Sequence, residues 1–116
     1  WDVDHRTRGV GNPWFLLFAN CDWFQSLVKE KWQLIHNQNV IAKITEYIDF
    51  VTENYAENFE ADYEKWGNVG KNFLLGNELC PGAARCHNQK EASAYLRDWL
   101  VKRFASLDEI WLGNQD

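Results

Sequence analysis

The segment from residue 40 to residue 66 constrains the fold of this chain more than any other, because its apolar side chains recur every three or four residues. The series is Ile41, Ile44, Ile48, Val51, Tyr55, Phe59, Tyr63 and Trp66. At this spacing the side chains lie on one face of an α-helix and form a continuous stripe about seven turns long. The pattern predicts one uninterrupted helix over 40–66, which Gly67 ends.

A second helix is expected over residues 22–36. Asp22 followed by Gln25 fits a capping box, in which two side chains satisfy backbone donors of the first turn. The apolar side chains of this segment also follow helical spacing, and they are Phe24, Leu27, Val28, Trp32 and Ile35. The polar run over 36–39 then ends this helix.

A third helix is expected over residues 89–112, with Asn88 as its cap, Glu91 three residues later and Gly113 at its end. Its apolar face consists of Ala92, Leu96, Trp99, Leu100, Phe104, Leu107, Ile110 and Trp111. We expect this face to pack against the helix over 40–66.

These segments predict an all-α fold, a bundle of three long helices with an irregular N-terminal segment and a long loop over 67–87. A loop of about twenty residues is longer than usual, so it is either ordered by its own packing or functional. A chain of 116 residues is expected to form a single helical domain, 1–116. Six of the seven tryptophans lie in apolar runs or at helical spacing, which favours a place in the core over a carbohydrate-binding surface.

The net charge of −5 comes from one part of the chain, residues 41–66, which contains seven acidic side chains and only two basic ones, Lys43 and Lys65. The sequence has neither a basic stripe nor an apolar run of membrane-spanning length, so we expect neither a nucleic-acid nor a membrane partner.

Asp49, Glu53 and Glu57 form a like-charged ridge at a spacing of four residues. This ridge is offset either by Lys90, Arg97 and Lys102 on an antiparallel helix or by a basic protein partner. Asp98 and Lys102 are expected to form an ion pair within their own helix.

Three further side-chain types leave alternatives open. Cys80 and Cys86 flank a Pro-Gly turn and form a disulfide, remain free thiols, or bind a metal together with His87, whereas Cys21 is expected to be a buried thiol. Arg103 lies beside the apolar face of its helix and either pairs with an acid of the 40–66 helix or contacts a phosphate or a partner. His36 and His87 flank helix ends and are expected to be caps or solvated residues rather than ligands.

The chain opens with Trp1-Asp2-Val3-Asp4, in which two carboxylates lie two positions apart. In an extended strand such side chains share one face. Carboxylates of this kind suit Mg²⁺, which proteins hold through one or two acids together with substrate phosphates. The alternative is that Asp2 and Asp4 are solvated acids at a chain end.

The order of motifs along the whole chain resembles the spore coat protein H (CotH) family. A W-D-x-D tetrapeptide is followed by a glycine, an aromatic-rich helix and a long amphipathic helix that ends near a tryptophan. Residues 95–108 then resemble the C-terminal helix of the family, with its W-L-x-x-R-x-x-x-L-D motif at Trp99, Leu100, Arg103, Leu107 and Asp108. In the family a glycine commonly follows the second Asp closely, whereas here it stands at Gly9.

The resemblance implies an atypical protein kinase that uses ATP and Mg²⁺, acts on spore-coat or secreted proteins and works outside the cytoplasm. It assigns Asp2 and Asp4 to the region of metal and nucleotide. The chain lacks a glycine-rich phosphate loop and an H-R-D tripeptide, so it corresponds to the C-terminal part of the domain. We therefore expect the isolated chain to be inactive and to depend on an upstream kinase-like lobe.

The alternative is a stand-alone helical protein-interaction module of a spore-coat or cell-surface protein. Under the kinase interpretation an upstream lobe would cover apolar surface near the N-terminus, centred on Trp14, Phe15, Leu16 and Phe18. Left uncovered, this surface is expected to form a homodimer.

Overall fold

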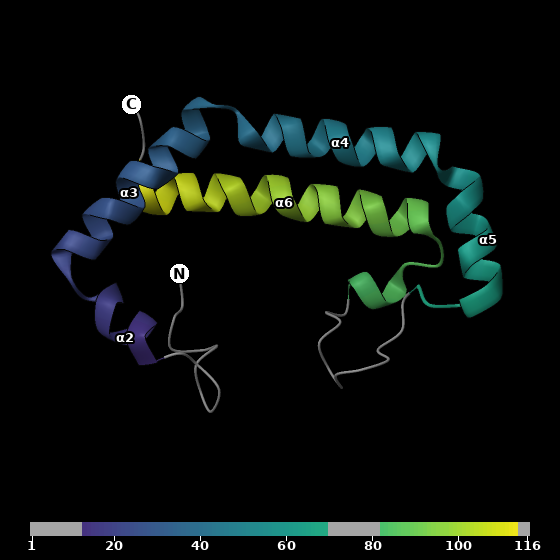
Figure 1. Ribbon diagram of the computed structural model, residues 1–116, viewed down its shortest axis with the longest axis horizontal. Coiled ribbons are helices and arrows are strands. Elements are labelled where there is room, and N and C mark those ends of the chain that lie inside the picture. The colour runs from purple at the N-terminus through teal and green to yellow at the C-terminus, as the bar shows by residue number, and fades with distance from the viewer. Residues whose placement is uncertain (1–12, 70–81, 114–116) are drawn as a thin grey trace. The chain divides into compact units, whose positions relative to one another are not determined.

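The computed structural model describes residues 13–69 and 82–113, and within these ranges every regular element is helical, which confirms the all-α class (Figure 1). The elements are α2 (Pro13–Ala19), α3 (Asp22–Asn37), α4 (Val40–Asn54), α5 (Ala56–Trp66), the 3₁₀-helix η1 (Ala83–Arg85) and α6 (Gln89–Trp111). Part of the expected N-terminal irregular segment is thus helical, and the expected loop contains η1. None of the described helices is both long and apolar enough to cross a membrane.

The chain divides into two compact units, residues 1–40 with 104–116 and residues 41–103, and α6 contributes to both. The expectation of one domain over 1–116 remains a prediction. Each unit is described separately below.

The first unit contains α2, α3 and the last turns of α6. Four aromatic rings connect α2 to the start of α3, with Phe18 at the centre: its ring lies 6.1 Å from Trp14, 5.5 Å from Trp23 and 5.9 Å from Phe24. Such edge-to-face and offset arrangements stabilise aromatic pairs beyond their burial. The short helix α2 is therefore attached to α3 through a small aromatic cluster.

The predicted capping box at Asp22 is wrong. Asp22 is the first helical residue, and Cys21 occupies the cap position without a side-chain bond to the first turn of α3. Gln25 donates instead to the carbonyl of Ala19, 2.8 Å away. The physical reason is that α2 ends directly before α3, so its free carbonyl competes for the Gln25 amide. Within the first turn Asp22 still complements the helix dipole.

The end of α3 agrees with the sequence. The helix stops at Asn37, and Asn39 adopts a left-handed conformation with φ 50° before α4 begins. Asparagine tolerates this region better than other non-glycine residues. The polar run over 36–39 is therefore a true helix end.

The second unit shows that the predicted continuous helix over 40–66 is wrong, because it is broken at Tyr55 into α4 and α5. Tyr55 has φ −119° and ψ 20°, outside the helical region. One residue earlier, the Asn54 amide donates to the carbonyl of Phe50 at 2.8 Å, a local side-chain bond that competes with the helical ladder. The chain then turns, and α5 runs in a different direction from α4 (Figure 1).

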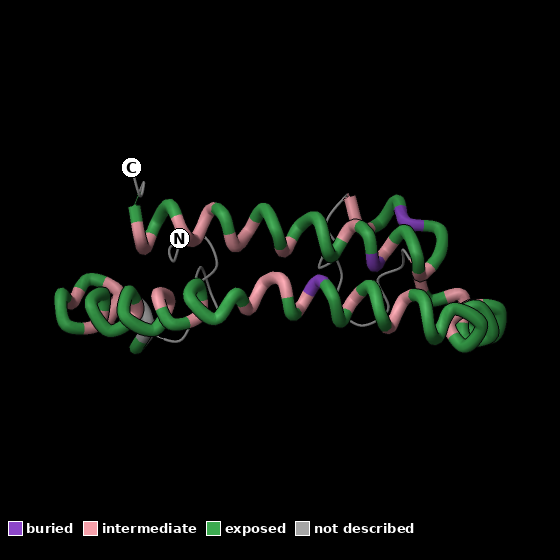
Figure 2. The backbone as a smooth tube through the Cα atoms, turned by 90° about the horizontal axis from the view of Figure 1, so that it is seen from above, coloured by how far each residue is buried: buried purple, intermediate pink, exposed green. Residues whose placement is uncertain are grey.

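Within this unit α4 and the first part of α6 run antiparallel and side by side (Figures 1 and 2). The two buried polar residues on these helices are small, Thr45 on α4 and Ser93 on α6. Small side chains allow helix backbones to approach closely. Arg97 on α6 pairs with Asp49 on α4 at 3.0 Å, as expected for an antiparallel neighbour.

Two predicted helix ends of the second unit are confirmed. Gly67 ends α5 in the left-handed conformation, with φ 55° and its N–H bonded to the carbonyl of Tyr63. At the start of α6 the Glu91 N–H donates to Oδ1 of Asn88 at 2.8 Å, and the Glu91 carboxylate accepts from the His87 N–H at 2.9 Å. Asn88 thus caps α6 as expected, and Glu91 reaches back to the N–H of His87, one residue before the cap, in a variant of the capping box.

The expectation that most tryptophans lie in a core is wrong for four of them. Trp14, Trp23, Trp66 and Trp99 are 46–62% exposed, and no large side chain of the described residues is fully buried. Leu96 and Trp99, predicted to pack against the preceding helix, are each about half exposed. Figure 2 shows that few of the described residues are buried. The helices therefore present extensive apolar surface.

Candidate functional site

The predicted metal carboxylates, Asp2 and Asp4, lie outside the described residues. Among the residues that are described, no group of three or more His, Cys, Asp or Glu side chains is arranged to hold a metal ion. The metal assignment therefore remains a prediction, and the candidate surfaces come from the helices.

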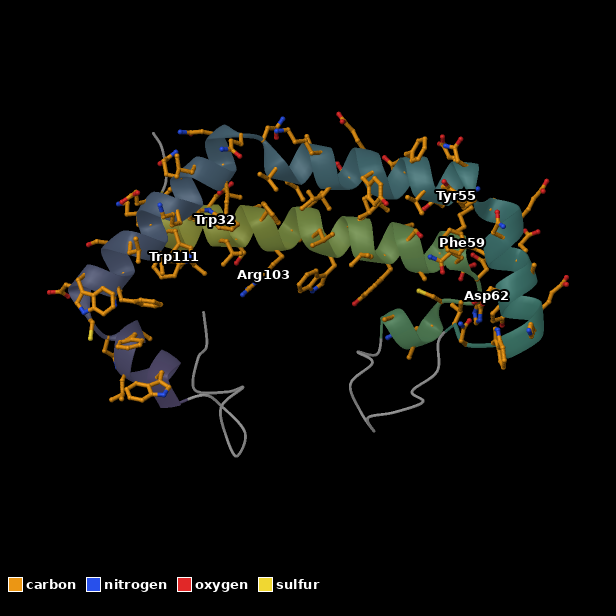
Figure 3. All side chains as sticks on the ribbon, viewed as in Figure 1. Trp32, Tyr55, Phe59, Asp62, Arg103 and Trp111 are labelled. Carbon is orange, nitrogen blue, oxygen red and sulfur yellow. The ribbon has the colours of Figure 1, made fainter. Side chains whose placement is uncertain are left out.

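The first candidate surface is an apolar groove between α3 and the end of α6, in the first unit. It is lined by Leu27, Val28, Lys31, Trp32, Ile35, Leu107 and Trp111, and its volume is about 270 Å³. Trp32 and Trp111 come from the two helices and lie near each other (Figure 3). A groove of this size is smaller than most small-molecule sites, which favours a side chain of a packing partner as its occupant.

Asp108 is the polar anchor beside this groove. Its Oδ1 accepts the indole N–H of Trp32 at 2.8 Å and lies 3.1 Å from Nδ1 of His36. The Trp32 ring also lies 5.1 Å from the ring of Phe104. One carboxylate of α6 thus receives two side chains of α3, so His36 is a partner of Asp108 rather than a cap.

The residues of the W-L-x-x-R-x-x-x-L-D motif have different roles in the structure. Leu107 lines the groove and Asp108 anchors α3, whereas Trp99 is 46% exposed. Arg103 is half-buried, and the interpretation that it pairs with an acid of the preceding helix is wrong: it makes no ion pair with any described residue and points away from α4 (Figure 3). Arg97, six residues earlier in α6, is instead the arginine that pairs with α4, at Asp49. A contact of Arg103 with a phosphate or partner remains open.

The second candidate surface is a groove of about 350 Å³ in the second unit, where α4, α5 and the start of α6 meet. It is lined by Thr52, Glu53, Ala56, Phe59, Glu60, Tyr63, Asn88, Gln89 and Lys90.

The predicted acidic ridge does not continue along one helix, because the break at Tyr55 places Asp49 and Glu53 on α4 and Glu57 on α5. The Asp98–Lys102 ion pair within α6 is confirmed, at 2.6 Å.

The described cysteines, Cys21 and Cys86, belong to no metal-binding group among the described residues. Cys86 is a buried free thiol with its Sγ 3.9 Å from the carbonyl of Gly82, and Cys80 lies outside the described residues. Cys21 is a free thiol that is partly exposed, not buried as expected, and its Sγ donates to the carbonyl of Leu17. His87 is exposed and precedes α6.

Sequence reasoning missed the contacts of Asp108 with Trp32 and His36. A partial indication was present, because an indole N–H on an apolar helix face needs an acceptor when it is partly buried. The acceptor is 76 residues away in the sequence, so no local spacing identified it.

Comparison with protein-family models, with curated proteins and with solved structures gives no match for this chain.

Proposed function

We propose that this chain is the C-terminal helical part of a CotH-like atypical protein kinase, whose intact parent phosphorylates coat or secreted proteins outside the cytoplasm with ATP and Mg²⁺. The ordered W-D-x-D and W-L-x-x-R-x-x-x-L-D motifs support the family. In this proposal Asp2 and Asp4 contribute metal-binding carboxylates and the helices act as a scaffold.

The observation that carries the proposal is the exposed apolar surface formed by α2 and the start of α3. Trp14, Leu17 and Trp23 are 61%, 62% and 58% exposed, respectively. Side chains of this size are energetically costly to leave in water, and patches of this kind mark sites where another surface packs. In the intact parent this surface would pack against an upstream kinase-like lobe.

The C-terminal motif supports the scaffold role. Leu107 lines the groove between α3 and α6, and Asp108 of α6 accepts the indole N–H of Trp32 on α3. Phosphoryl transfer depends on phosphate-binding groups, metal ions and a positioned Lys or Arg acting together. Arg103, which has no partner among the described residues, is available for a phosphate or for the upstream lobe.

The test compares the isolated chain with a longer parent that contains it, both incubated with labelled ATP and Mg²⁺. The parent should transfer label, the chain alone should not, and Asp2→Asn or Asp4→Asn in the parent should abolish transfer. Asp22→Asn, which changes an exposed acid of α3, is the matched control and should leave transfer unchanged. A parent without ATP-dependent transfer would refute the proposal.

The same exposed surface also favours the second candidate, a stand-alone helical interaction module of a coat or surface protein. The two differ in what covers Trp14 and Trp23. Acrylamide quenching of tryptophan fluorescence should fall when upstream sequence is added if the kinase proposal is correct. If the chain is a stand-alone module, quenching should fall only when a separate partner protein binds or when two copies of the chain associate. Sedimentation then distinguishes the homodimer from a complex with another protein.

A further inference from the structure

The groove of the second unit has an aromatic floor and a charged rim. Phe59 (Figure 3) and Tyr63 of α5 supply apolar surface to the groove, which Asn88, Gln89 and Lys90 at the start of α6 also line. Glu53 of α4 and Glu60 of α5 line the same groove. Among the described residues that line it, Lys90 of α6 is the only lysine. This combination is suited to an amphipathic ligand.

The acids around this groove are not neutralised by the described part of the chain. Of the seven acids over 41–66, Asp49 pairs with Arg97 and Asp62 accepts from Asn68. The other five make no ion pair or hydrogen bond with a described residue, and they are Glu46, Glu53, Glu57, Glu60 and Glu64. Lys65 lies over the ring of Trp66 at 4.8 Å instead of pairing with one of them.

An anionic ligand does not fit this groove, even though the N-terminus of α6 forms one wall. Helix N-termini attract anions through their free N–H groups. Here Asn88 already accepts the Glu91 N–H, and the carboxylate of Glu91 already occupies the position beside the His87 N–H. The start of α6 thus carries its own anion, which adds to the negative potential of the groove.

We propose that this groove docks a basic amphipathic peptide segment of a partner protein. An apolar side chain of the peptide packs on Phe59 and Tyr63, while Lys or Arg side chains pair with Glu53 and Glu60. The charge complementarity of the rim argues for this occupant. The proposal does not depend on the kinase assignment, because it uses only residues of the second unit.

The probe is a fluorescein-labelled peptide of Lys and Leu patterned as an amphipathic helix, titrated with the full chain by fluorescence anisotropy. Binding should weaken with added salt, as expected for partly exposed ion pairs. Two comparison peptides separate the contributions: one replaces Lys by Glu, and the other replaces Leu by Ser. Both should bind at least about tenfold more weakly.

The decisive variants are Glu53→Gln with Glu60→Gln, compared with the matched control Glu46→Gln with Glu64→Gln. Both doubles remove the same charge from exposed glutamates, but only the first lies in the groove. The first should weaken peptide binding about tenfold and the control less than about twofold. Equal weakening by both would mean general charge attraction and would overturn the proposal, as would equal binding of the Ser peptide.

Phe59→Ala tests the floor of the groove. It should weaken binding of the Leu peptide about tenfold and leave the weak binding of the Ser peptide unchanged, with helix content checked by circular dichroism. Glu53→Gln with Glu60→Gln replaces only exposed carboxylates and is expected to retain the fold, so it remains decisive if Phe59→Ala unfolds.

Discussion

In the unit that contains α3, Asp108 of α6 bonds to two side chains of α3. In the unit that contains α5, Asp49 of α4 pairs with one exposed arginine of α6. Asp108 is about two thirds buried and lies beside the part-buried indole of Trp32. Asp49 and Arg97 are each about half exposed. An aspartate thus stabilises helix packing in one unit and makes only a weak surface contact in the other. The difference arises because the loss of a hydrogen bond lowers the free energy of unfolding more when the partner is buried.

The largest expected difference between the units comes from their tryptophans. Trp32→Ala should lower the free energy of unfolding by about 2–4 kcal/mol, because the ring packs on Phe104 and its N–H bonds to Asp108. Trp66→Ala, the matched control, should cost less than about 1 kcal/mol because its ring is 62% exposed. Urea denaturation measures both, and equal losses would show that the two units are alike.

A smaller loss is expected from Trp99→Ala in α6. A fully buried tryptophan would cost about 3–5 kcal/mol on truncation, but this side chain is 46% exposed, so about 2 kcal/mol is expected. The midpoint of urea unfolding gives the value. A loss as large as that of a buried ring would indicate that Trp99 is covered in solution.

The aspartates themselves should rank next. Asp108→Ala removes the acceptor of the Trp32 indole and the partner of His36, and should cost about 1–2 kcal/mol. Asp49→Ala breaks only the exposed pair with Arg97 and should cost less than about 1 kcal/mol. Thermal unfolding of the two variants, compared with the unmodified chain, is the measurement; a reversed order would contradict the assignment of Asp108 as the anchor.

The smallest effect concerns the break between α4 and α5. Asn54→Ala removes the bond to the Phe50 carbonyl and introduces a better helix former, so it should raise stability by about 0.5 kcal/mol. Backbone chemical shifts of Tyr55 should move toward helical values. If they stay unchanged, the break has a cause other than the Asn54 side chain.

The sequence predicted the helix boundaries at Asn88 and Gly67 correctly, but it misplaced the cap at Asp22 and missed the break at Tyr55. Asn88 with Glu91 and Gly67 act locally, so their spacing was sufficient. The break at Tyr55 escaped prediction because the apolar spacing continues through it unchanged, whereas the structure shows it in the non-helical φ and ψ of Tyr55. Contacts between distant segments depend on how the helices pack: the expected pairing of Arg97 with the preceding helix is found at Asp49, whereas no local pattern indicated the contact of Trp32 with Asp108.

The candidate site was the least predictable part. Asp2 and Asp4 were identified from their spacing, but they lie outside the described residues. The acidic excess over 41–66 was visible in the sequence, whereas the groove beside it arises from the change of direction after Tyr55. Burial of tryptophans was overestimated because helical spacing shows which side chains share a face and says nothing of what covers it.

The break at Tyr55 also separates the second unit into α5, which is expected to unfold locally, and α4, which is expected to stay folded when α5 opens. Because α5 starts without a side-chain cap and has no buried residue, its amides are expected to exchange with solvent hydrogen through local opening, without unfolding of α4. Phe59 and Tyr63 move with α5 in such an opening. A bound peptide would close this local equilibrium, so protection of the α5 amides would report occupancy of the groove.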